Sequence, residues 1–151
     1  MLTHYGPDGP SPAWLTYGGA ATVRQYLTLP DLRAPHLAWL AQRPLFWEND
    51  ALLVSHAGIA DVPNAYAPTD NDGLLWRRGP LKRLGKLQVV GHTPTLDGRP
   101  VFDTEHQACY LDTGAYQNKV LTGIRFSPEA RVLDIISVPT VARDLPAERR
   151  R

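Results

Sequence analysis

Apolar side chains recur at helical spacing in two short segments near the N-terminus. The first begins after Gly19 and ends before Pro30, and one of its faces carries Ala20, Val23, Tyr26 and Leu27. The second runs from Arg33 to Gln42, tolerates Pro35 in its first turn, and carries an apolar stripe of Leu37, Leu40 and Ala41. We therefore expect two N-terminal helices.

The pattern changes to short strands after Pro44. Runs typical of strands follow, in chain order Leu45–Trp47, Ala51–Ser55, Leu87–Val90, Tyr110–Leu111, Lys119–Phe126 and Arg131–Val138. The first two and the last two are each joined by a short polar turn, which predicts two hairpins. The sequence therefore predicts an α/β protein with strands throughout residues 45–138 behind two helices.

Length and charge limit the function classes. The 151 residues fit one domain, which we place at residues 14–138 between an irregular segment, 1–13, and a basic tail, 139–151, that we expect to fray. Sixteen Lys and Arg against fifteen Asp and Glu give a net charge of +1. A near-neutral chain argues against a dedicated nucleic-acid binder, because affinity for the phosphate backbone comes mainly from clustered basic residues.

Cysteine usage and hydropathy bear on the compartment. Cys109 is the single cysteine, which excludes an internal disulfide framework and a thiolate metal cluster. No apolar run approaches the roughly 18 residues needed to span a bilayer, and the first residues show no signal-peptide pattern. We expect a cytoplasmic protein without membrane or nucleic-acid partners.

Two histidines follow predicted strands in similar surroundings. His56 lies in Ser-His-Ala-Gly-Ile at 55–59, and His92 lies in Gly-His-Thr-Pro at 91–94. Neutral imidazoles from adjacent strand ends can converge on one divalent ion, although a catalytic metal normally takes at least three protein ligands. The alternative is that both are core histidines satisfied by backbone groups. Asp112, at the next strand end, would either orient one imidazole from behind or cap its own turn.

A basic pair follows an aromatic residue in Leu-Leu-Trp-Arg-Arg at 74–78. A guanidinium offers a planar fork of donors that matches phosphate oxygens, so Arg77 or Arg78 is a candidate phosphate ligand. The alternative is a solvated basic pair beside a packed tryptophan. The remaining histidines, His4, His36 and His106, lack comparable surroundings, and we expect them at the surface.

Five motifs in order resemble one family. They are the segments at 14–22, 55–59, 74–78 and 91–94 and Leu-Asp-Thr-Gly-Ala at 111–115, and together they cover residues 14 to about 126. Their order and spacing are similar to those of bacterial calcineurin-like metallophosphoesterases, in particular the serine/threonine protein phosphatases and the symmetrical diadenosine tetraphosphatases. One such motif alone is weak, whereas five in order are specific.

The resemblance implies a four-layer α/β/β/α sandwich with two divalent metals, Mn, Fe or Zn, at the strand ends. By motif, His56 and His92 match the two late metal ligands of the family. Arg78 matches the arginine that contacts substrate phosphate, and Arg77 occupies a variable position. In the family a metal-bridged hydroxide attacks phosphorus in line, and the substrates include phosphorylated proteins and nucleotide polyphosphates.

Three earlier family blocks have no counterpart. Here no Asp is followed two places later by His, and no Asn-His pair occurs. Four of six metal ligands are therefore missing. We expect this chain to be the C-terminal part of a phosphoesterase, beginning where the family has just passed its third block, and to be inactive alone. The alternative is a truncated or divergent non-catalytic binding module that self-associates through an exposed sheet.

Overall fold

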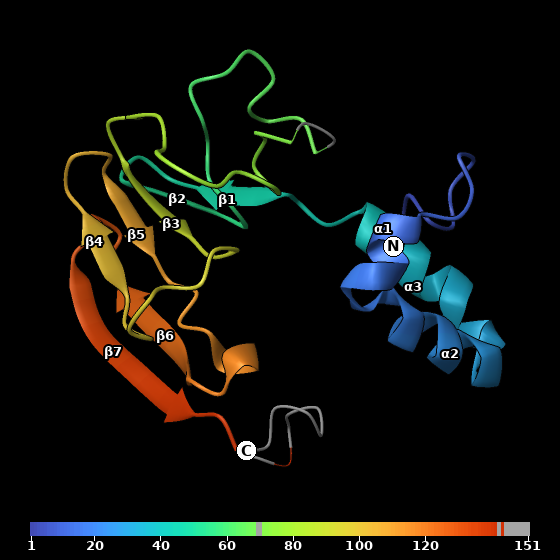
Figure 1. The fold of residues 1–151 in the computed structure, drawn as a ribbon. Helices are drawn as coiled ribbons and strands as arrows, with labels where there is room; N and C mark the ends of the chain where they lie inside the picture. The colour runs from blue at the N-terminus through green and yellow to red at the C-terminus, as the bar shows by residue number, and fades with distance from the viewer. Residues whose placement is uncertain (69–70, 142, 144–151) are drawn as a thin grey trace. The chain divides into compact units, whose positions relative to one another are not determined.

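The computed structural model describes residues 1–68, 71–141 and 143. The chain divides into two compact units, Met1–Pro44 and Leu45–Arg151, drawn in Figure 1 from blue to cyan and from cyan to red. Most of the tail expected to fray, residues 142 and 144–151, lies outside the described residues.

The N-terminal unit is helical, as the apolar spacing predicts. Its elements are α1 (Pro12–Trp14), η1 (Leu15–Gly19), α2 (Ala20–Thr28), η2 (Pro30–Leu32) and α3 (Arg33–Ala41). The Oγ atom of Ser11 caps α1 by accepting the N–H of Trp14. Both expected helices are confirmed as α2 and α3. The apolar face predicted for α2 is only partly covered, because Leu27 on that face is 77% exposed.

The second unit contains a five-stranded mixed sheet in the order β1-β2-β3-β5-β4. Its strands are β1 (Phe46–Glu48), β2 (Leu52–Ser55), β3 (Leu87–Val90), β4 (Val101–Asp103) and β5 (Ala108–Tyr110). The first predicted hairpin is confirmed, because β1 pairs with β2 in antiparallel fashion. The sequence pattern did not predict β4, the edge strand beside β5.

The three central strands are parallel, and their carboxyl ends meet at one edge. Ser55 of β2 pairs with Val90 of β3, which in turn pairs with Tyr110 of β5. The polar residues that follow these strands, His56, His92 and Asp112, are therefore delivered to the same edge. This is the position at which parallel sheets commonly carry functional groups.

Alternation along the strands builds a core on each face of the sheet. One cluster contains Leu53, Ile59, Ala65 and Leu74. The other contains Leu52, Val89 and Cys109, with Ile124 and Phe126 packed against it. Gln88 is fully buried in β3 and is the exception to this apolar pattern.

The second predicted hairpin is confirmed as β6 (Val120–Phe126) and β7 (Val132–Pro139), which form a sheet of their own (Figure 1). One side of β6 contributes Ile124 and Phe126 to the core. Every residue of β7 is exposed. Among the described residues, no helix has the length and apolar character needed to cross a membrane.

Candidate metal and phosphate site

The two histidines singled out by motif lie against each other at the carboxyl edge of the sheet. The Nε2 atom of His56 is 2.9 Å from the Nδ1 atom of His92, and the ring centroids are 4.8 Å apart. The expectation that neighbouring strand ends bring these rings together is confirmed. The two nitrogens share a hydrogen bond, in which the tautomers of the rings decide which nitrogen donates.

His56 is placed by the chain immediately around it. Its carbonyl accepts the N–H of Gly91 at 2.9 Å, which joins the loop after β2 to the loop after β3. Gly58 then turns with φ +91°, and a Cβ atom there would lie 2.7 Å from Cδ1 of Leu81. Only glycine satisfies both the positive φ and the close approach, so this turn fixes the direction of the chain behind His56.

His92 is held in a strained turn. It has φ +65°, and the N–H of Thr93 donates across it to the carbonyl of Gly91 at 2.7 Å. A positive φ at a residue bridged in this way is the mark of a rare γ-turn. The backbone carbonyl of Trp76 interacts with the His92 ring, and the Trp76 ring lies 6.0 Å from it, edge to face. Strain of this kind is characteristic of functional positions.

The structure distinguishes the two adjacent arginines by their contacts. Arg77 is engaged: its Nη1 donates to Asp72 at 2.7 Å, and its Nε and Nη2 donate to the carbonyl of Pro80. Arg78 donates from Nη1 to the Thr93 hydroxyl at 3.2 Å, and none of the described carboxylates pairs with it. The exposed guanidinium of Arg78 is therefore available to an anion beside the histidines.

Asp112 caps its own turn. Its Oδ1 accepts the N–H of Gly114 at 3.0 Å, and its carbonyl accepts the N–H of Thr95. Its hydrogen bonds within the described residues include none to an imidazole. Its negative charge nevertheless acts on the histidines, because it raises the pKa of both.

Both imidazoles are biased toward the neutral form. Burial lowers the pKa of His56 and of His92 from the ordinary 6.5, and the positive charge of Arg78 lowers them further. The effect of burial exceeds the opposing effect of Asp112 in both cases. A neutral ring nitrogen is the form that binds a metal ion, so the pair is prepared for ligation at neutral pH.

The donor set fits a metal site but does not complete one. A metal ion held by both nitrogens would replace the hydrogen bond that now joins them, and binding would release the proton of that bond. No group of three or more His, Cys, Asp or Glu suited to a metal occurs within the described residues. The chain therefore offers two nitrogen ligands where a catalytic ion takes at least three.

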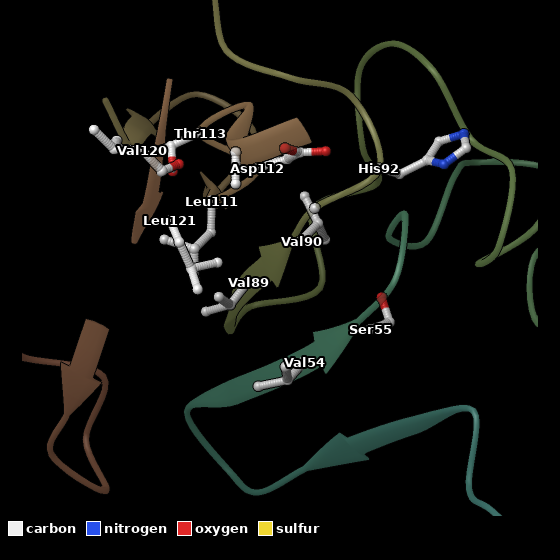
Figure 2. A pocket seen from close by; sticks show the side chains of 12 residues that line it. Val54, Ser55, Val89, Val90, His92, Leu111, Asp112, Thr113, Val120 and Leu121 are labelled. Carbon is white, nitrogen blue, oxygen red and sulfur yellow. The ribbon is translucent and has the colours of Figure 1, made fainter. Parts of the chain in front are cut away.

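An open groove of about 320 Å³ runs from His92 and Asp112 along the sheet toward β6 (Figure 2). Its walls are mainly aliphatic and include Val54, Val89 and Leu121. Figure 2 shows His92 and Asp112 on one side of the aliphatic side chains of Val89, Leu111 and Leu121.

The other three histidines are only partly as expected. His36 is exposed and contacts the Tyr26 hydroxyl at 2.9 Å. His4 and His106 are of intermediate exposure, partly covered by their neighbours. The Nδ1 atom of His106 lies 2.8 Å from the carboxylate of Asp103, in the turn after the unpredicted β4.

Sequence reasoning also missed Thr93 and the Trp76 carbonyl. Thr93 follows His92 directly in its motif, and that adjacency was the available signal. Comparisons of the chain with protein-family profiles, with curated proteins and with solved structures find no match.

Proposed function

We propose that this chain supplies two histidine ligands and a phosphate-binding arginine to a metal-dependent phosphoesterase of the calcineurin-like type. The observation that carries the proposal is the meeting of the His56 and His92 rings beside Arg78. The order of the five motifs supports the same reading. We also propose that the chain forms the C-terminal portion of a four-layer α/β/β/α sandwich.

Each residue has a defined part in such a reaction. Nε2 of His56 and Nδ1 of His92 would hold a divalent ion, Mn, Fe or Zn, and the strained turn at His92 keeps its ring in place. Bound ions of this kind activate water and neutralise charge on the phosphoryl group. Arg78 would bind two phosphate oxygens through its guanidinium fork and orient the ester.

The chain alone should not turn over substrate. Two imidazoles provide too few ligands for a two-metal centre, and the missing ligands would come from another polypeptide segment. The purified chain with excess Mn²⁺ is therefore expected to leave p-nitrophenyl phosphate intact. In a complemented enzyme, a phosphorylated protein or a nucleotide polyphosphate would be the substrate. A buried single cysteine is consistent with a reducing compartment, and we place the protein in the cytoplasm.

Phosphate binding tests the proposal in the chain as it exists. Inorganic phosphate is titrated while the backbone amide of Thr93 and the side-chain Nε–H of Arg78 are followed by NMR. We expect saturable shifts at both groups, and we expect Arg78→Gln to abolish them. Arg83→Gln removes the same charge from another exposed position and should change nothing. Equal binding by the two variants would contradict the assignment of Arg78.

A non-catalytic role is the second candidate, and the β6–β7 hairpin favours it. Among the described strands β7 pairs with β6 alone, and it is exposed along its whole length, with Ile136 at 61% and Val138 at 56%. An exposed apolar edge strand is a template for pairing, and a second copy of this chain offers the same edge. Light scattering after size exclusion should then show a dimer that Ile136→Lys dissociates. A monomer at all concentrations would remove this candidate.

A further inference from the structure

A second cavity, of about 360 Å³, adjoins the same two loops that hold the histidines. Ala57, which follows His56, lines it, and so do Gly91 and Thr93 on either side of His92. Tyr110, which pairs with Val90 in the sheet, forms another part of the wall. The two hollows share Gly91 and otherwise have different lining residues. We call this second one the Tyr110 cavity.

The walls of the Tyr110 cavity are electrically neutral and largely apolar. Val101 and Pro94 contribute aliphatic surface, and Tyr110 contributes an aromatic ring. The one charged residue in the wall, Arg77, is neutralised by Asp72 at 2.7 Å and bonded to the carbonyl of Pro80. A second anion is therefore a poor occupant, whereas an uncharged organic group fits such a wall.

Two hydroxyl groups in this wall lack partners among the described residues. Thr95 is 7% exposed, and its Oγ1 is buried without a hydrogen bond. The hydroxyl of Tyr110 makes no hydrogen bond to a described group, and burial raises its pKa. Buried polar atoms in folded proteins are nearly always paired, so the unpaired Thr95 hydroxyl beside the cavity points to a missing ligand.

Thr93 connects the Tyr110 cavity to the anion site. Its hydroxyl accepts from Nη1 of Arg78 at 3.2 Å, and the same residue lines the cavity. A phosphate held by Arg78 would therefore lie beside Thr93, which also lines a neutral cavity large enough for an aromatic ring.

We propose that the Tyr110 cavity binds the organic group of the phosphoester and selects a planar aromatic group over a short aliphatic one. The inference rests on the proposed function, because Arg78 must hold the phosphate. An aromatic ring can pack against Tyr110 and bury apolar surface, whereas the single methylene of a phosphoserine would leave the cavity mostly empty. Aryl phosphates and nucleoside monophosphates share the required planar ring.

Affinities of the purified chain for four probes test this selection. They are inorganic phosphate, O-phosphoserine, phenyl phosphate and adenosine 5′-monophosphate. Phenyl phosphate should bind about tenfold more tightly than inorganic phosphate, and phosphoserine no more tightly than inorganic phosphate. The adenosine arm shows whether the cavity also admits a nucleoside. Equal affinity for phenyl phosphate, phosphoserine and inorganic phosphate would overturn the proposal.

A variant that fills the cavity supplies the control. Val101 lies on the edge strand β4 and is 45% exposed, so Val101→Trp should fold, abolish the preference for phenyl phosphate and leave inorganic phosphate binding unchanged. Leu121→Trp, on the groove of Figure 2, should retain the preference. Independently of any variant, phenyl phosphate should shift the Val101 methyl resonances and inorganic phosphate should not. Absence of all phosphate binding would overturn both proposals, whereas binding without preference would overturn only this one.

Discussion

Gln88 carries a fully buried amide that links two loops of the second unit. Its Oε1 accepts the N–H of Ile59 at 2.8 Å, and its Nε2 donates to the carbonyl of Lys82 at 2.7 Å. Ile59 closes the loop that begins with His56, and Lys82 belongs to the segment that leads into β3. Replacement by Met, Gln88→Met, keeps the side-chain volume nearly constant but removes both hydrogen bonds.

The cost of Gln88→Met follows from the two backbone groups left without partners. An unpaired buried donor or acceptor costs about 1–3 kcal/mol. Ile59 is 1% exposed, so the loss of its N–H partner should account for most of the destabilisation. Lys82 is exposed, so water can reach its carbonyl more easily. We expect the free energy of unfolding to fall by about 2–4 kcal/mol.

Urea unfolding, followed by tryptophan fluorescence, measures this loss. Gln107→Met is the matched control, because Gln107 makes an exposed bond from Gly85 at 3.1 Å that water can replace. The control should lose less than about 1 kcal/mol. Equal losses for the two variants, or no loss for Gln88→Met, would refute the reasoning.

Four further predictions concern the site and its core. Arg78→Leu should raise the pKa of His56 and of His92, and Asp112→Asn should lower both, as measured by NMR titration. Folding lowers the pKa of both histidines, so their contribution to the free energy of unfolding should be fully present above pH 6.5 and should be lost as the pH falls through their folded pKa values. A contribution from the pair that grows as the pH falls would contradict these pKa directions. Gly58→Ala should lose about 2 kcal/mol in urea and more than Gly85→Ala, which has open space around its Cβ position. Cys109 is buried with its pKa raised to about 11, so a thiol reagent at pH 8 should react only through unfolding, and rapid native labelling would show otherwise.

The parts of the fold that periodicity predicts are those with strong local patterns. The strand Leu87–Val90 was predicted with the observed bounds, and the placement of His56 near His92 follows once β2 and β3 are parallel. β4 was missed because it is a three-residue edge strand whose residues do not alternate clearly between apolar and polar. Leu27 was predicted on a covered face of α2 but is exposed, because helical spacing identifies which residues share a face but not what covers that face.

The parts of the site that escaped prediction depend on contacts between distant segments. The family resemblance already selected Arg78 over Arg77, but the hydrogen bond from Arg78 to Thr93, 15 positions away, could not be predicted from the basic pair itself. Gln88 similarly gains its role from Ile59, 29 positions away. No local pattern encodes either arrangement.

Zinc affinity of the purified chain, determined by chelator competition, tests the central claim most directly. His56→Ala and His92→Ala each remove one of the facing nitrogens, and His36→Ala removes an exposed imidazole elsewhere in the chain. We expect one bound ion whose affinity falls by about tenfold or more in each of the first two variants and is unchanged in the third. The same affinity in all four proteins would contradict a metal site built on His56 and His92.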